Sequence, residues 1–381
     1  MSLPSYTGLT WDHPRGYVAL EKAAEQARAQ GLSLQWKRQP LEGFESHPIE
    51  ELADQYDLIV LDHPHIGDAV AADCLQPLES LFDAPALQAW KKQSIGNTFE
   101  SYLYGGKHWA LPLDAASQVA AYREDRLDES PPATWEATLA FARRHPVALS
   151  LAGPHAILSL FSMSAAHGDA PAAANPERLF EGRGASVAWE LMQQLYALSY
   201  KGWAERNPIA ILEALARDAQ AVYCPLVYGY VNYSVANDQR HAVHFTDVPA
   251  GPSGRLGSVL GGTGLAVSRR TKVSDALLAH LAGLLSPATQ RDFIPFAEGQ
   301  PSARMAWSDE RVNKAWGGFF AQTKRTLEQA IVRPRHPQYV PFQTAASACV
   351  RQALADRLAA TEVINALQSL YERHGPAHSE V

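Results

Sequence analysis

Two groups of polar and aromatic side chains lie near the start of the chain, each at or just after the end of a short apolar segment. They are Trp11, Asp12 and His13, and Asp62, His63 and His65. Carboxylates accept hydrogen bonds from hydroxyl groups, imidazoles donate or accept them, and an indole ring offers a flat apolar face. Together these residue types can bind a small polyhydroxylated molecule, with its C–H face on the ring and its hydroxyls on the carboxylates.

Other residues of the same types lie further along the chain. Asp114 would add a carboxylate and Trp316 a second ring, while Tyr228 and Tyr230 belong to a tyrosine-rich segment suited to ring contacts. Arg335, in the proline-stiffened turn 333–337, could clamp a carboxylate or phosphate with its planar fork. The alternatives are core packing for each ring, loop caps for the aspartates and a solvated surface turn for the arginine.

A glycine run at residues 257–264 has the glycine spacing of a phosphate-binding loop but lacks its lysine. Close approach of the backbone is the better interpretation, because glycines leave main-chain N–H groups open to ligand oxygens. We therefore expect Gly262 and Thr263 to contact ligand. A β-bulge without a ligand is the alternative.

Metal binding and catalysis are both weighed against binding alone. Asp62, His63, His65 and Asp68 have enough donors for a metal, but Pro64 favours a stiff loop, so we predict no metal site. The chain has no Gly-x-Ser-x-Gly or His-Glu-x-x-His motif, and we predict no cofactor and no enzymatic activity. A glycoside-type hydrolase using paired carboxylates stays the second hypothesis, and a cytoplasmic ligand sensor the third.

The elements around these residues follow an α/β order. Residues 6–11, 32–36 and 57–61 predict strands, and residues 17–30 and 48–55 predict helices between them. Ligands bind at the carboxyl ends of strands in such sheets, so Trp11 to His13 and Asp62 to His65 should face one crevice. Beyond a Gly-Gly hairpin at residues 104–108, residues 118–122 and 221–224 predict strands, residues 258–267 predict two strands, and residues after 273 are mostly helical.

Composition limits the class of protein. The 381 residues suit two domains, and a net charge of -7 without a basic cluster excludes nucleic-acid binding. The three separated cysteines predict buried thiols rather than disulfides or a zinc site, and no apolar run reaches the roughly 18 residues of a membrane span. The start lacks the pattern of a secretory signal peptide. Either a leader was removed, which implies the periplasm or cell envelope, or Met1 is the native start and the protein is cytoplasmic.

Four segments, in this order and spacing, resemble the extracellular solute-binding proteins of family 1, the group around maltose-binding protein. They are the hairpin at residues 104–114, the helix start at 131–136, the glycine-rich strand at 258–267 and the helix pair at 276–291. The Trp-Asp-His-Pro and Asp-His-Pro-His elements suggest a narrower subgroup within this family.

The resemblance implies a two-lobed type II periplasmic-binding-protein fold, with a mixed sheet flanked by helices in each lobe and a helical C-terminal region. Residues 1–112 and 255–305 would form the first lobe, and residues 113–254 and 306–381 the second. It further implies a monomer that closes its lobes on a small solute, without catalysis, and docks on the permease of an ABC transporter. A sugar is the family expectation, and the histidines, Arg333 and Arg335 keep an organic acid or sugar acid open.

Overall fold

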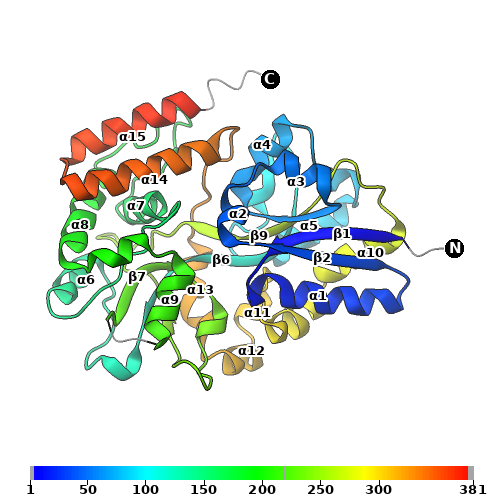
Figure 1. The fold of residues 1–381 in the computed structure, drawn as a ribbon, viewed down its shortest axis with the longest axis horizontal. Helices are drawn as coiled ribbons and strands as arrows, with labels where there is room; N and C mark the ends of the chain where they lie inside the picture. The colour runs from blue at the N-terminus through cyan, green and yellow to red at the C-terminus, as the bar shows by residue number, and fades with distance from the viewer. Residues whose placement is uncertain (1–3, 218–219, 376–381) are drawn as a thin grey trace. The chain divides into compact units, whose positions relative to one another are not determined.

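The chain divides into two compact units. The structure is a computed structural model that describes residues 4–217 and 220–375. Unit 1 comprises Met1–Ala115 and Gly261–Ala315, and unit 2 comprises Ala116–Leu260 and Trp316–Val381, so the chain passes between them three times. The blue start of the chain and part of its yellow segment therefore share one unit (Figure 1). The sequence had placed these boundaries after residues 112, 254 and 305.

Unit 1 is built on a mixed sheet with the strand order β2-β1-β3-β9. Its strands are β1 (Ser5–Trp11), β2 (Ser33–Gln39), β3 (Leu58–Leu61) and β9 (Leu260–Val267). β1 pairs in parallel with both β2 and β3, whereas β9 runs antiparallel to β3. The carboxyl ends of β1 and β3 and the amino end of β9 consequently lie at the same edge of the sheet.

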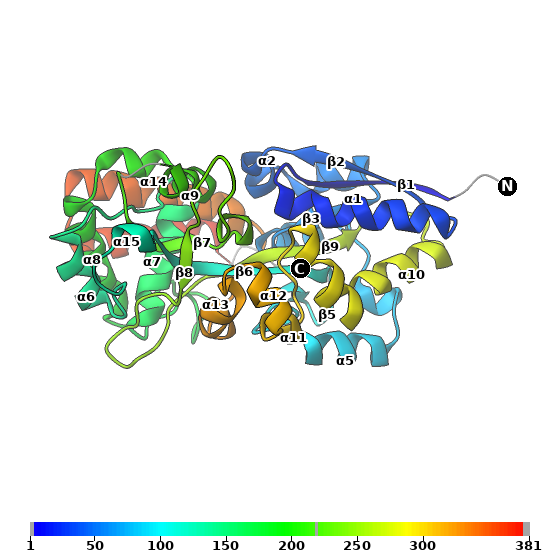
Figure 2. The same cartoon turned by 90° about the horizontal axis from the view of Figure 1, so that it is seen from below.

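Helices cover both faces of this sheet. They are α1 (Pro14–Ala29), α2 (Leu41–Ser46), α3 (Ile49–Gln55), α4 (Ile66–Ala71), α5 (Ala84–Gln93), α10 (Asp275–Leu284), α11 (Arg304–Trp307) and α12 (Glu310–Ala315). β3 is buried on both sides, because Leu58 and Val60 join the core under α1 and α10 while Ile59 and Leu61 join the core under α3 and α4. The continuous apolar run that predicted this strand reflects that double burial. Figure 2 shows α1 lying along β1 and β2.

Two predictions about strands were wrong in detail. β6 (Leu111–Tyr122) is one strand of 12 residues rather than a lead-in and a separate strand, and β9 is one strand rather than two. The Gly-Gly hairpin between β4 (Leu103–Tyr104) and β5 (Lys107–His108) is present, with φ of 56° and 76° at its glycines. Such left-handed backbone favours glycine.

Unit 2 is mostly helical. Residues of β6 pair with β7 (Tyr223–Tyr228) and β8 (His244–Thr246) in antiparallel fashion. The helices are α6 (Trp135–Ala142), α7 (His155–Ala166), α8 (Gly184–Leu198), α9 (Pro208–Arg217), α13 (Phe319–Glu328), α14 (Tyr339–Asp356) and α15 (Ala360–His374). Every residue of α7 is buried, and its neighbours α8 and α14 pack against α15, so α7 is the central helix of this unit (Figure 1).

The predicted α/β fold with a helical C-terminal region is confirmed. The prediction of buried thiols holds for Cys224 only, because Cys74 and Cys349 are partly exposed. Burial raises the pKa of the Cys224 thiol to about 12 and that of Cys74 to about 11. In the described part of the chain, no helix is both long and apolar enough to cross a membrane.

Candidate functional site

The register of the unit 1 sheet brings three of the sequence-predicted segments to one edge. Leu9 pairs with Ile59 in the parallel ladder, so the ends of β1 at Trp11 and of β3 at Leu61 lie two residues further on in the same direction. Leu61 pairs with Gly264 of the antiparallel strand, so Thr263 lies next to Asp62. Segments far apart in sequence therefore meet where β1 and β3 end and β9 begins.

The three residues at the end of β1 have different surroundings. The Trp11 indole packs against Phe44 at a ring-centroid distance of 5.2 Å, and a Cβ at Gly16 would lie 2.5 Å from its ring, so this unit's own core covers the ring. Asp12 is exposed, with a carboxylate oxygen 3.6 Å from an Arg38 guanidinium nitrogen. The Nδ1 atom of His13 accepts a hydrogen bond from the Arg15 backbone N–H at 3.1 Å, which caps the start of α1.

Asp114 forms a buried ion pair that the sequence did not reveal. The Nε atom of Arg15 donates to Asp114 Oδ2 at 2.9 Å, and its Nη2 atom donates to Oδ1, so the contact is bidentate. Both residues are 6% exposed. Burial raises the pKa of the Asp114 carboxyl above its usual value, the nearby Asp62 charge adds to the rise, and the Arg15 guanidinium opposes it. That coupling also places Asp62 within electrostatic reach of the pair.

The end of β3 turns directly into a short 3₁₀ helix, η1 (His63–His65). The Asp62 carboxylate accepts the His63 backbone N–H at 2.8 Å and lies 3.0 Å from the His63 Nδ1 atom, which caps this turn. The His63 ring meets Tyr102 edge to face at 6.5 Å. His63 and His65 are both buried, and with Pro64 between them they make up η1.

The candidate metal ligands in the described part of the chain lie elsewhere than at His63 and His65. Within residues 4–217 and 220–375, the group of donor atoms close enough to share an ion is Asp128, Glu129 and His145, far in sequence from η1. Glu129 there already accepts a hydrogen bond from Arg144 at 2.7 Å. None of the histidines at the end of β3 belongs to that group.

The glycines of β9 have separate roles. Gly262 has a φ of 95°, a conformation that favours glycine whether or not a ligand approaches. A Cβ at Gly264 would lie 2.6 Å from the Tyr102 ring, so this position is closed to a larger side chain by packing. Thr263, between them, is 2% exposed, and its Oγ1 atom has no hydrogen-bond partner among the described residues.

The remaining predicted residues belong to unit 2. Tyr228 ends β7 and donates a long hydrogen bond of 3.4 Å to the Leu260 carbonyl, and its ring meets His155 edge to face at 5.8 Å. Tyr230 is 5% exposed, whereas Trp316 and Arg335 are partly exposed.

The two arginines of the turn at residues 333–337 differ in burial. Arg333 is 3% exposed and donates to Gln343 Oε1 at 3.1 Å and to the Leu260 carbonyl at 3.4 Å. Tyr228 and Arg333 thus share one acceptor. Arg335, the predicted ligand residue, is the more exposed of the two.

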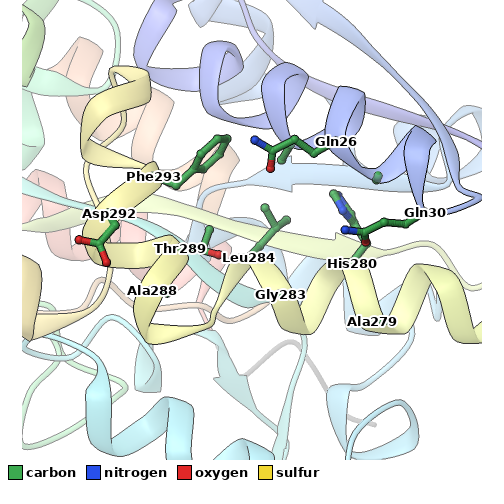
Figure 3. Close-up of a pocket in the computed structure, with 12 residues that line it drawn as sticks. Gln26, Gln30, Ala279, His280, Gly283, Leu284, Ala288, Thr289, Asp292 and Phe293 are labelled. Atoms are coloured by element: carbon green, nitrogen blue, oxygen red, sulfur yellow. The ribbon is translucent and has the colours of Figure 1, made fainter.

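One groove in unit 1 is lined by none of these residues. It is an open groove of about 370 Å³ between α1 and the segment from α10 to Phe293 (Figure 3). Its lining combines alanines and a glycine with the polar residues Gln26, Gln30, His280, Thr289 and Asp292. None of the sequence-predicted residues lines it, so its size alone does not mark it as the site.

A much smaller cavity, of about 20 Å³, adjoins the predicted residues. Trp11, Arg15, Asp114 and Thr263 all line it, together with Leu113 and other apolar side chains. The sequence missed Arg15, although its place in the first turn after a strand end is where a ligand-facing cation would be sought.

Comparison of the sequence with known protein families gives one match. A family model described as bacterial extracellular solute-binding protein matches residues 49–319. No curated protein matches the chain.

Solved structures of similar fold cover nearly the whole chain. An ABC transporter solute-binding protein from Agrobacterium radiobacter, in complex with ribitol, aligns with a TM-score of 0.80 and 19% identity over 97% of this chain and 98% of that one. The maltose-bound MalE3 of T. maritima gives 0.79 and 17% over 96% and 98%. UgpB from Mycobacterium tuberculosis, in complex with glycerophosphocholine, gives 0.76 and 15% over 97% and 98%. At these identities the likeness shows the fold alone.

Proposed function

Since the chain belongs to the family of bacterial extracellular solute-binding proteins, we propose that it binds a small polyhydroxylated solute, a sugar or polyol, and delivers it to the permease of an ABC transporter. The family implies both the solute and the permease partner. It also suggests a periplasmic or cell-envelope location, which we adopt as part of the proposal. A monomeric state is the simplest assembly consistent with this role.

The observation that carries the proposal is the Arg15–Asp114 pair at the carboxyl edge of the unit 1 sheet. A bidentate arginine–carboxylate pair has no net charge, yet it leaves carboxylate lone pairs and guanidinium N–H groups that can meet ligand hydroxyls. Asp62 and Thr263 lie at the same edge. A neutral ligand rich in hydroxyl groups suits this set better than an ion does.

We propose that Asp114, Asp62 and Thr263, with the newly found Arg15, contact the ligand from unit 1. His13, His63, His65 and Gly262 would then shape and support this edge, Trp11 would line the small cavity beside it, and Asp12 would lie at its exposed margin. The roles of Tyr228, Tyr230, Trp316 and Arg335 in unit 2 stay predictions. Ligands named for similar structures, ribitol and maltose among them, support the choice of chemical class.

An organic acid or sugar acid is the second candidate. The buried Arg333, beside Tyr228, is the observation that favours it, because a guanidinium recognises carboxylates in a planar, bidentate manner. A hydrolase has less support. Asp62 is engaged by His63 and Asp114 by Arg15, so neither carboxylate is placed as a free acid or nucleophile.

A thermal-shift panel tests the proposal. Pentoses, hexoses, their polyols, sugar acids and small carboxylates would each be added at a series of concentrations. One neutral polyhydroxylated class should stabilise the protein by an amount that grows with concentration, about 2.7 kcal/mol at a hundredfold excess over Kd. Stabilisation by carboxylates alone would instead establish the second candidate, and stabilisation by none of the panel would contradict the proposal.

A further inference from the structure

Two residues that line the small cavity at the edge of the unit 1 sheet each carry a buried polar atom without a hydrogen-bond partner in the described part of the chain. Trp11 is 3% exposed and Thr263 is 2% exposed, and both residues line this cavity. The Trp11 Nε1 and Thr263 Oγ1 atoms are fully buried and have no hydrogen-bond partner among the described residues. Leaving such an atom unpaired destabilises the folded protein, and buried polar atoms in native proteins nearly always have a partner.

The rest of the lining does not provide that partner. The amide nitrogen of Gln300 is engaged, because it donates to the Ala115 carbonyl at 3.0 Å. Asp114 and Arg15 are paired with each other. Leu20, Leu113 and Ile294 are among the remaining lining residues and offer no side-chain polar group.

The size of the cavity limits its occupant to one small group. Its volume of about 20 Å³ just exceeds the roughly 10–15 Å³ that one water needs, and a site with several polar partners holds water stably. The occupant must accept from the indole N–H and exchange a hydrogen bond with the threonine hydroxyl. Because the ion pair on the same wall has no net charge, neither a cation nor an anion is favoured, and one hydroxyl oxygen meets every requirement.

We propose that this cavity binds a single oxygen, that of a water in the ligand-free protein and that of one ligand hydroxyl in the complex. Trp11 then acts through its N–H group, since Phe44 and Gly16 cover its ring. The second half of the proposal rests on the function proposed above. It makes Trp11 and Thr263 determinants of specificity, because a ligand lacking that hydroxyl would not form hydrogen bonds with either atom.

A crystal structure of the ligand-free protein, at a resolution that shows waters, tests the first half without any ligand. We expect one water within hydrogen-bonding distance of both Trp11 Nε1 and Thr263 Oγ1. An empty cavity would overturn the proposal. This result does not depend on whether a sugar or polyol is ever found to bind.

The second half is tested with Thr263→Val, which keeps the β-branched shape and removes the hydroxyl, and with Thr263→Ser as the control that keeps it. Affinities would be measured by calorimetry for the stabilising sugar or polyol of the panel and for its monodeoxy analogues. We expect Thr263→Val to bind the unmodified sugar or polyol about tenfold more weakly than the unmodified protein does, and Thr263→Ser to bind it normally. One monodeoxy analogue should bind both variants with equal affinity. Equal binding of the parent by Thr263→Val and the unmodified protein would overturn this half, whereas no binding by any compound would refute the proposed function itself.

Discussion

The Arg15–Asp114 pair should be the most consequential polar contact of unit 1. Replacing Arg15 by methionine would keep the bulk of the side chain and leave a carboxylate that is 6% exposed without its counter-charge. Removing one partner of a buried pair typically costs about 3–5 kcal/mol. We expect a loss of that size in the free energy of unfolding, measured by urea denaturation.

The matched control is Arg38→Met. Arg38 also makes bidentate contact with a carboxylate, that of Glu21, but both side chains are 37% exposed. Surface pairs contribute about 0–1 kcal/mol, so this variant should unfold almost as the parent does. Similar losses in the two variants would show that burial of the Arg15 pair is not what matters.

The deficit of Arg15→Met should also depend on pH. Burial already raises the pKa of Asp114, and removing the guanidinium that opposes the rise will raise it further. A carboxyl whose pKa in the folded state exceeds its unfolded value, about 3.9, is destabilising above that value and increasingly so as pH rises toward the folded pKa. The deficit relative to the parent should therefore shrink as pH falls from about 8 toward 4, and a constant deficit would contradict this assignment.

Only those residues of the site that a local sequence pattern marks could be predicted. The ends of β1 and β3 were identified because apolar runs mark strands, and polar residues directly after them lie at one edge. Arg15 was missed because its partner, Asp114, is 99 positions away in the chain. The covered ring of Trp11 likewise depends on Phe44, which no local pattern connects to it.

At the scale of elements, the first helix depends on a glycine for its contact with β1. A Cβ at Gly16 would lie 2.5 Å from the Trp11 ring. Gly16→Ala should therefore destabilise the protein by about 1–3 kcal/mol through overpacking, although alanine is the better helix former. Thermal or urea unfolding measures this change.

Gly283 of α10 provides the opposite case on a second helix of the same unit. A Cβ there would meet no atom within 4 Å, because this residue lines the open groove in Figure 3. Gly283→Ala should be neutral or stabilising by up to about 1 kcal/mol. If Gly16→Ala were equally harmless, the close packing of α1 on Trp11 would be refuted.

Most elements follow from apolar periodicity, and the exceptions have a physical cause. β6 was predicted in pieces because polar residues interrupt its apolar pattern, yet the strand continues through them, and Gln118 among them is buried and hydrogen-bonded. The Oε1 atom of Gln118 accepts from Ser162, and the Ser258 hydroxyl donates to the Gln118 carbonyl at 2.6 Å. Partners from other segments satisfy these groups, so the strand continues through them. Sequence patterns around one strand do not contain that information.

At the scale of the whole molecule, chain length predicted two domains and four short segments indicated the family. The family match over residues 49–319 confirms the second inference, and the similar structures confirm the fold class. The identity of the solute could not be predicted, because it depends on a few side chains within a fold that serves many ligands. A net charge of -7 likewise indicates solubility rather than a substrate.

The central claim is that the chain binds a neutral polyhydroxylated solute and releases it unchanged. Isothermal titration calorimetry with the stabilising compound of the panel, followed by NMR of the recovered ligand, tests this most directly. We expect saturable binding of one ligand per chain and recovery of the ligand with its covalent structure intact after prolonged incubation. Appearance of a hydrolysis product, or binding confined to charged carboxylates, would contradict the account.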